Sequence, residues 1–332
     1  IYTGEDTLSL HDALPIFIIM RIISKLIRFI LLPVFTLVAI GLVILAEKDI
    51  PREKLKSIYT NSASKFMPLM GMNVHYRDEG NRADSTPLIL IHGMSSSLNT
   101  WDSLVILMKD KKRLISIDLP GFGLTGPNPE NKYGFDYYTK FLDSFLTNLN
   151  IKNCILAGNS MGGGVSWHYA VSHPEKVNQL ILIDAVGYQG KKGKGSLGFK
   201  IASMPVVNNL LLYITPKFLI KKSLETVFTN QNKITEKEID RYHNLTIAEG
   251  NRKAALSIFK NGFVQEPEKI QSITTPTLII WGDQDHLITV DNAYQFHKNI
   301  KGSELVVLKN VGHVPMEEVP EVVANSIFSF IK

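Results

Sequence analysis

The stretch Leu156-Ala-Gly-Asn-Ser-Met-Gly-Gly163 decides the fold, because it places Gly-x-Ser-x-Gly between a strand and a helix. Cys154 to Ala157 is a short apolar run typical of a buried strand, and Gly163 to Val171 has the composition of a helix start. A strand that turns sharply into a helix lifts one serine hydroxyl, that of Ser160, clear of the sheet. Glycine on both sides of this serine lets the strand and the helix approach closely.

Short apolar runs alternate with longer helical segments on both sides of this turn. The predicted strands are Met72–Arg77, Leu88–Ile91, Leu114–Asp118, Cys154–Ala157, Leu180–Asp184, Thr277–Trp281 and Leu305–Leu308. The predicted helices are Thr100–Lys109, Tyr137–Leu149, Gly163–Ser172, Asp291–Lys298 and Pro320–Ile331. This alternation predicts an α/β fold with a mostly parallel sheet that helices cover on both faces.

One long interval, residues 188–267, interrupts the alternation with helical periodicity and no obvious strand. We expect it to be a helical cap inserted between two strands of the sheet. Residues 71–187 and 268–332 then form the two parts of the core, and residues 47–70 read as a charged linker.

An acid and a histidine follow Ser160 in the order that would support chemistry at its hydroxyl. Asp285 comes directly after the predicted strand Thr277–Trp281, and His313 follows the predicted strand Leu305–Leu308 by a few residues. A serine hydroxyl is a poor nucleophile by itself, so it needs a base in hydrogen-bond reach and a third group that orients this base.

The region from about residue 70 to the end of the chain resembles the α/β-hydrolase superfamily. The motifs that carry the resemblance are His92-Gly93, Asp118-Leu-Pro-Gly-Phe-Gly123, Gly158-Asn-Ser-Met-Gly162, Trp281-Gly-Asp-Gln-Asp285 and Gly312-His-Val-Pro-Met-Glu-Glu-Val-Pro320. The order of the serine, the acid and the histidine is also the order of this superfamily.

The resemblance implies a role for each matching residue. Ser160 would be the nucleophile, His313 its general base, and Asp285 the acid that orients the imidazole. The family pattern Trp-Gly-x-x-Asp selects Asp285 over the nearby Asp283. The backbone N–H groups of Met94 and Met161 would form the oxyanion hole.

Several other polar residues suit structural roles better than catalysis. We expect His92 to fix its turn by hydrogen bonds and Asp118 to satisfy backbone donors at its own turn. His286 reads as a partly exposed loop residue, and His168 and His173 lie on or just after the helix that follows Ser160.

Two serine-dependent reactions remain open after the motifs are compared. Haloalkane dehalogenases and soluble epoxide hydrolases resemble this region but have aspartate in place of Ser160. The serine motif resembles both bacterial lipases and esterases and the meta-cleavage C–C bond hydrolases. The latter usually continue His-Gly with Gly-Pro-Gly and have tryptophan after the histidine, whereas this chain has Met94-Ser-Ser-Ser97 and Val314.

The sequence therefore favours a carboxylic ester hydrolase whose substrate is a small-molecule apolar ester. The alternatives are a C–C bond hydrolase and, in a different class, a non-catalytic ligand-binding or receptor protein.

Composition excludes several other kinds of protein. The 332 residues are 45% hydrophobic and 20% charged, which is ordinary for a globular enzyme and too apolar for a disordered chain. The net charge of +5 comes without a nucleic-acid-binding module. Cys154 is the single cysteine, and no zinc-type spacing of histidine and cysteine is present. We expect no cofactor and no metal, and the sequence does not indicate an oligomeric state.

The N-terminal segment predicts attachment to a membrane. Residues 1–19 resemble translated sequencing-adapter read-through, so we expect them to be non-native and the natural chain to start at Met20. Residues 20–46 contain the run Phe29 to Ala46, eighteen residues without a charge, which spans about 27 Å as a helix, close to the thickness of a bilayer core. The gene product would be anchored in a bacterial inner membrane with the hydrolase domain outside the cytoplasm. A cleaved signal peptide is the alternative, because Ala39-Ile-Gly41 offers small residues for cleavage, but the apolar run continues beyond it.

The start of the predicted cap is basic and apolar. Between Tyr188 and Leu224 there are seven lysines and no acids, and the lysines flank apolar runs such as Val206 to Ile214. Two interpretations fit this pattern: a surface that lies near anionic lipid, or an ordinary roof over the pocket with solvated lysines.

Overall fold

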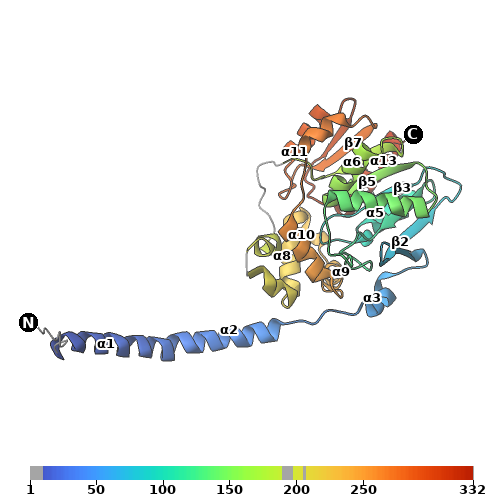
Figure 1. Cartoon of the computed structure of the whole chain (residues 1–332). Coiled ribbons are helices and arrows are strands. Elements are labelled where there is room, and N and C mark those ends of the chain that lie inside the picture. The colour runs from blue at the N-terminus through green and yellow to red at the C-terminus, as the bar shows by residue number, and fades with distance from the viewer. Residues whose placement is uncertain (1–9, 189–196, 205–206, 332) are drawn as a thin grey trace, which may run out of the picture. The chain divides into compact units, whose positions relative to one another are not determined.

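The computed structural model describes residues 10–188, 197–204 and 207–331. It divides the chain into two compact units, Ile1–Glu47 and Lys48–Lys332 (Figure 1). Three of the lysines predicted to make the cap basic, at positions 191, 192 and 194, lie outside the described residues, as does Val206.

From Leu10 to Leu45 the first unit is a continuous helical segment. It consists of α1 (Leu10–Leu26), one π-helical turn η1 (Ile27–Leu31) and α2 (Leu32–Leu45). Residues Ile18–Leu45 are long and apolar enough to cross a membrane, and the most apolar stretch of this helix is exposed throughout. A membrane anchor and a signal sequence both satisfy this description. The helix already begins at Leu10, within the segment that we expected to be non-native.

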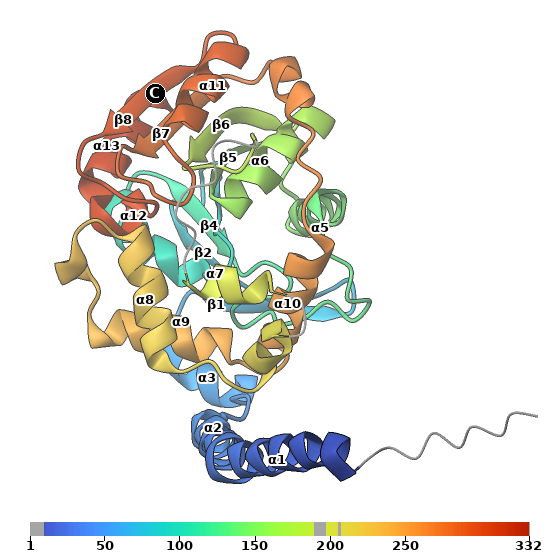
Figure 2. The same cartoon turned by 90° about the vertical axis from the view of Figure 1, so that its left-hand side faces the viewer.

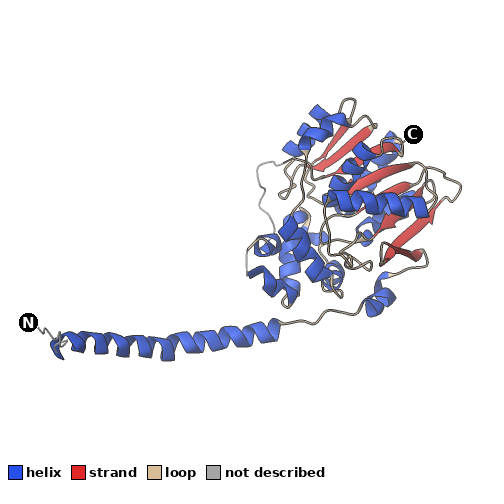
Figure 3. Cartoon of the chain, in the orientation of Figure 1, coloured by secondary structure: helices blue, strands red, loops and turns tan. Residues whose placement is uncertain are grey.

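The second unit contains an eight-stranded sheet in the order β1-β2-β4-β3-β5-β6-β7-β8. Figure 3 shows its strands in red, with helices packed around them. The strands are β1 (Ser64–Leu69), β2 (Met72–Gly80), β3 (Leu88–Ile91), β4 (Arg113–Ile117), β5 (Cys154–Asn159), β6 (Val177–Ile183), β7 (Thr277–Gly282) and β8 (Glu304–Leu308). Strand β2 pairs antiparallel with β1 and β4, and the six strands from β4 to β8 in this order run parallel. The predicted α/β fold with a mostly parallel sheet is confirmed.

The prediction of a linker over residues 47–70 is wrong. These residues contain α3 (Arg52–Tyr59) and β1, and β1 is an edge strand of the sheet. An edge strand has one unpaired side, so it tolerates Pro68 and the exposed Lys65, and its composition resembles a linker.

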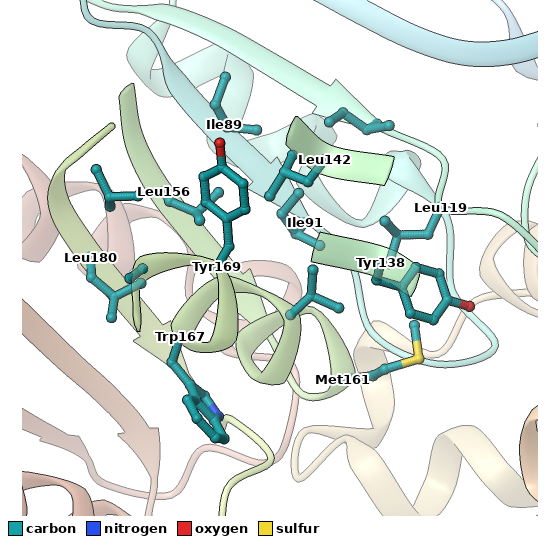
Figure 4. Packing of buried hydrophobic residues seen from close by; sticks show 14 of the residues in the cluster. Ile89, Ile91, Leu119, Tyr138, Leu142, Leu156, Met161, Trp167, Tyr169 and Leu180 are labelled. Atoms are coloured by element: carbon teal, nitrogen blue, oxygen red, sulfur yellow. The ribbon is translucent and has the colours of Figure 1, made fainter. Parts of the chain in front are cut away.

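Helices cover both faces of the sheet because successive strand residues point to opposite faces. Ile89 and Leu156 belong to the apolar cluster under α5 (Phe135–Asn148) and α6 (Met161–Ser172), which Figure 4 shows. Their neighbours Leu90 and Ile155 belong to the opposite cluster, which includes residues of α4 (Asp102–Met108) and α13 (Pro320–Phe330). The remaining core elements are η2 (Leu98–Trp101), α11 (Asp291–Asn299) and α12 (Pro315–Glu318).

Between β6 and β7, all described elements are helical. They are α7 (Leu197–Ala202), η3 (Val207–Leu212), α8 (Lys217–Val227), η4 (Gln231–Lys233), α9 (Glu236–Thr246), α10 (Asn251–Asn261) and η5 (Pro267–Ser272). Helices α7 to α10 gather at one side of the sheet, as Figure 2 shows. We call residues 188–267 the insertion.

Candidate active site

Ser160 occupies the sharp turn between β5 and α6. Its backbone has φ 56° and ψ −119°, a conformation that side-chain-bearing residues rarely adopt. Gly158 and Gly162 make the turn possible, because a Cβ on Gly158 would collide with the carbonyl oxygen of Gly162, and a Cβ on Gly162 with that of Ile91. The Ser160 N–H donates to the carbonyl of Ile183 at the end of β6, at 3.0 Å. The strand-to-helix turn predicted from the sequence is therefore present.

His313 and Asp285 form a buried pair. Their Nδ1 and Oδ2 atoms lie 2.6 Å apart, and both side chains are almost completely buried. The other carboxylate oxygen of Asp285 accepts from the N–H groups of Leu287 and Ile288, at 2.8 and 2.9 Å. Because Asp285 is held from both oxygens, it fixes the imidazole so that Nε2 is the ring atom able to take up a proton.

The geometry distinguishes Asp285 from its neighbour Asp283. Asp283 points elsewhere and accepts from the N–H of Asn310 at 2.7 Å. The acid bonded to His313 is thus the one that the pattern Trp-Gly-x-x-Asp selects.

The serine turn, the histidine loop and the His92-Gly93 turn meet at one place. Asn159, the residue before the serine, donates its amide to the carbonyl of His313 at 3.0 Å. A Cβ on Gly93 would lie 3.0 Å from the Cβ of Ser160, so the chain passes directly beside the serine there. Met94 follows this glycine, and Met161 is the first residue of α6, where backbone N–H groups have no partner within the helix. Both expected oxyanion-hole residues therefore flank the two segments that meet at Ser160.

His92 and Asp118 have the structural roles expected from the sequence. His92 bonds the carbonyl of Gly93 and accepts from the N–H of Leu119, and burial lowers the pKa of its imidazole. Asp118 accepts from the N–H groups of Leu98 and Leu124, at 2.8 Å each.

Asp118 also has a partner that sequence reasoning missed. The ring of His75 lies 2.7 Å from its carboxylate. Burial alone would raise the pKa of Asp118, but the hydrogen bond and charge of His75 outweigh burial and lower it. His168 is a core residue: burial lowers its pKa to about 4, and the ring stacks on Trp167.

Asp184 is a second acid beside the site that the motifs did not single out. It follows β6, has φ 45°, is fully buried, and accepts from the N–H of Gly282 at 3.0 Å. Its carboxylate, that of Asp285 and a ring nitrogen of His313 lie within 4.8 Å of one another. Burial, and then the negative charge of Asp285, raise the pKa of Asp184 well above its ordinary value, which favours the neutral form of this carboxyl. The only signal in the sequence was an acid as the last residue of the predicted strand Leu180–Asp184.

These three side chains also form the one cluster, among the described residues, that is close enough to share a metal ion. The hydrogen bond between His313 and Asp285 already uses the facing atoms of two of them. This hydrogen bond therefore explains the closeness of His313 and Asp285 without an ion between them.

Two glutamates after His313 fasten the histidine loop to the insertion. Glu318 accepts from the N–H of Gly312 with one oxygen and from those of Thr229 and Asn230 with the other, at 2.7 to 3.0 Å. The N–H of His313 donates to the carbonyl of Val227, the last residue of α8, at 2.8 Å.

Glu317 makes a second connection, to α9 and η2. It accepts from Arg241 and Tyr242 of α9 and from Thr100 of η2. The position of the histidine loop therefore depends on the insertion as well as on the sheet.

An apolar cavity of about 150 Å³ lies within the insertion. Most of its lining is aliphatic or aromatic and comes from α8 and α10. Leu219 and Leu224 of α8 and Leu256 and Phe259 of α10 are among the lining residues. It reaches the site at Met94 and at Val227. A larger groove, of about 710 Å³, lies between α3, α4 and α9, but its lining is partly charged and includes no residue of the serine turn or the histidine loop.

Comparisons with known proteins identify the family of this chain. The family model for the alpha/beta hydrolase fold matches residues 86–320. A 2-hydroxy-6-oxo-6-(2'-aminophenyl)hexa-2,4-dienoic acid hydrolase of Metapseudomonas resinovorans is 27% identical, over 84% of this chain and 93% of its own. Lipase 1 of Psychrobacter immobilis is also 27% identical, over 83% of this chain and 84% of its own. The crystal structure of a membrane phospholipase A has the same fold, with a TM-score of 0.69 and 23% identity, over 97% of this chain and 98% of that one. The chain therefore belongs to the α/β-hydrolase family and is a hydrolase.

Proposed function

We propose that the protein is a serine hydrolase that cleaves carboxylic esters of apolar acids through an acyl-Ser160 intermediate. The observation that carries the proposal is the buried His313–Asp285 pair, joined through Asn159 to the turn that presents Ser160. Such a pair supplies the base and its orienting acid next to a hydroxyl that needs both.

In the proposed reaction the Ser160 hydroxyl attacks the ester carbonyl carbon while His313 Nε2 takes its proton. The N–H groups of Met94 and Met161 would stabilise the negative oxygen of the tetrahedral intermediate. The imidazolium then returns the proton to the departing alkoxide, which leaves as the alcohol. Water, deprotonated by His313, attacks the acyl-enzyme and releases the acid and free Ser160. Asp285 stabilises the imidazolium in both steps.

The cavity supports an apolar acyl group. Its lining is aliphatic and aromatic, and it opens at Met94, one of the proposed oxyanion donors. An acyl chain bound there would lie against Met94, which follows the glycine that passes beside Ser160. Engineered apolar cavities of similar volume bind small apolar ligands such as benzene.

The experiment is hydrolysis of p-nitrophenyl esters from acetate to palmitate by the wild type and by Ser160→Ala. We expect turnover by the wild type and a loss of at least about a thousandfold in the variant, because serine and base act as a unit. The chain-length optimum would separate an esterase from a lipase. Turnover that persists in Ser160→Ala would contradict the proposed nucleophile.

C–C bond hydrolysis is the second candidate, and the similarity to the dienoic acid hydrolase favours it. The residues after His92-Gly93 and after His313 favour the ester, because they lack the glycine-proline and tryptophan features of the C–C hydrolases. A 2-hydroxy-6-oxo-dienoate assayed beside the esters decides between them. Turnover of neither substrate class would favour a non-catalytic binding role.

We further propose that the N-terminal segment, residues 20–46, anchors the enzyme in a bacterial inner membrane with the hydrolase unit outside the cytoplasm; the helix Ile18–Leu45 covers nearly all of it. Its length and apolar composition support a span. Basic residues lie on both sides of it, so orientation must be measured. Protease digestion of intact spheroplasts would degrade residues 48–332 if they lie outside and spare them if they lie inside.

A further inference from the structure

Exposed apolar side chains concentrate on one segment of the insertion. Among the described residues of 48–332, eleven large apolar side chains are exposed, and four of them lie within residues 204–218. These four are Met204, Leu210, Tyr213 and Phe218, and Tyr213 and Phe218 are 64% and 59% exposed. We call these four residues the outer face of the insertion.

The same segment also lines the apolar cavity from its other side. Leu211, next to Leu210, lines the cavity, and so do Leu219 and Ile220, which follow Phe218. The residues that line the cavity account for the packing of this segment against the rest of the insertion. They do not explain why the four residues of the outer face are also apolar. A helix that is apolar on both sides normally has a second apolar medium against it.

The positive charge around the outer face indicates which apolar medium would cover it. Residues 188–224 carry seven lysines and no acids, as the sequence shows. Lys200, Lys221 and Lys222 are exposed on α7 and α8. Two lysines of α8 meet acids from outside this range: Lys217 bonds Asp240, and Lys222 bonds Glu225. Exposed apolar side chains among lysines are the pattern of a surface that lies on anionic lipid.

The chain just after the apolar N-terminal helix is fastened to the insertion. Asp49 accepts from Arg252 of α10 at 2.6 and 2.9 Å and from the N–H of Gly250 at 3.0 Å. Ile50 exchanges backbone hydrogen bonds with Ile247 and Glu249. The segment that leads out of the proposed anchor thus ends on the insertion and not on the sheet.

We propose that the outer face of the insertion docks on an anionic bilayer, with Tyr213 and Phe218 entering the interface and the lysines facing lipid phosphates. The proposal concerns binding and does not depend on Ser160, so it can fail while the proposed reaction stands, and the reverse. Docking would bring the cavity behind this face next to the lipid phase.

The test uses residues 48–332, which contain the whole sheet and all the apolar core clusters and should therefore fold without the anchor. This piece carries Ser160→Ala, so lipid hydrolysis cannot disturb the vesicles. It is floated with vesicles of phosphatidylcholine alone and of three parts phosphatidylcholine to one part phosphatidylglycerol. We expect binding to the mixed vesicles and a loss of at least about tenfold in affinity for Tyr213→Ser/Phe218→Ser.

Tyr294→Ser/Val322→Ser is the matched control. Tyr294 and Val322 are exposed to a similar degree, 52% and 47%, but lie on α11 and α13. This control should bind mixed vesicles as the parent does. No binding of the parent, or an equal loss in both double variants, would overturn the proposal.

Two further experiments test the role of the lysines and the folding of the Tyr213→Ser/Phe218→Ser variant. Lys221→Gln/Lys222→Gln should weaken binding to the mixed vesicles, and equal binding to both vesicle types would overturn the anionic partner. In the background with Ser160 intact, Tyr213→Ser/Phe218→Ser should keep wild-type turnover of a soluble short-chain ester, because neither residue lines the cavity. Loss of that turnover together with lower thermal stability would show that the double variant misfolds. The proposal would then require Phe218→Tyr, which keeps the aromatic ring, to bind mixed vesicles as the parent does.

Discussion

The sheet and the insertion position the candidate site in different ways. The sheet places Ser160, Asp285 and Asp184 at the ends of buried parallel strands, where neighbouring backbone groups hold each of them. The insertion is fastened by a few side-chain bonds to the loop after β8, chiefly through Glu317 and Glu318. The difference suggests a division: the sheet fixes the reacting groups, and the insertion adjusts the histidine and selects the substrate.

Asp285→Asn tests the sheet side of this comparison and should have the largest effect. Asparagine keeps the shape but holds the imidazole in the wrong tautomer, so kcat should fall by about a thousandfold to ten-thousandfold. Asp283→Asn is the matched control, because Asp283 bonds Asn310 and does not contact His313. Steady-state kinetics on one ester measures both. A comparable loss in both variants would contradict the assignment of the acid.

Glu318→Ala tests whether the insertion also controls the chemistry. The substitution removes the acceptor of three backbone N–H groups, two of them on the insertion, and should destabilise the protein by about 2–4 kcal/mol. Because Gly312 precedes His313, we also expect kcat to fall by about tenfold to a hundredfold, through misplacement of the base. Glu318→Gln keeps one acceptor oxygen and should recover part of both losses. Reduced stability with unchanged kcat would show that the insertion does not position the histidine.

The sheet was far easier to predict from the sequence than the insertion. The strands expected at Leu88–Ile91 and Thr277–Trp281 match β3 and β7 to within one residue, because buried strands are continuous apolar runs. Strand β1 was missed, since a half-exposed edge strand lacks such a run. Asp283 and Asp285 were separated correctly because the family motif has a fixed spacing, and the side-chain geometry agrees.

Contacts that join distant segments could not be predicted in the same way. Glu317 and Arg241 are 76 residues apart, and neither belongs to a pattern that indicates the other. The bond between Asp49 and Arg252 crosses 203 residues. Asp184 was predicted as the end of a strand, but its closeness to Asp285 follows from the parallel order of β6 and β7, which only the folded sheet supplies.

Leu256→Trp tests whether the insertion selects the substrate by its acyl chain. Leu256 lines the cavity from α10, and a larger side chain would fill part of it. We expect about a tenfold loss of kcat/KM for long acyl chains and little change for acetate, because removing a few methylenes from contact weakens binding by a small amount each. Leu107→Trp, at an exposed position on α4, is the control. Equal losses for acetate and palmitate would place the acyl chain elsewhere.

Asp184→Asn should have the smallest effect on rate, because the raised pKa favours the neutral carboxyl, which an amide resembles, and the amide oxygen can still accept from the N–H of Gly282. Its effect should appear in the pH dependence of stability. Burial and the negative charge of Asp285 raise the pKa of Asp184 in the folded protein, whereas the unfolded chain ionises it near pH 4. As pH rises above about 4, the folded state therefore holds one proton more than the unfolded state, and this group lowers the free energy of unfolding until pH reaches the raised pKa.

Asparagine cannot ionise in either state, so the variant lacks this loss. Its free energy of unfolding, measured with urea on residues 48–332, should increase relative to the wild type between about pH 5 and about pH 7.5. A constant difference between the two proteins at both pH values would mean that Asp184 is ionised in the folded state. Two adjacent carboxylates would then share the site with His313, and the sheet would hold its reacting groups against charge repulsion instead of beside a neutral carboxyl group.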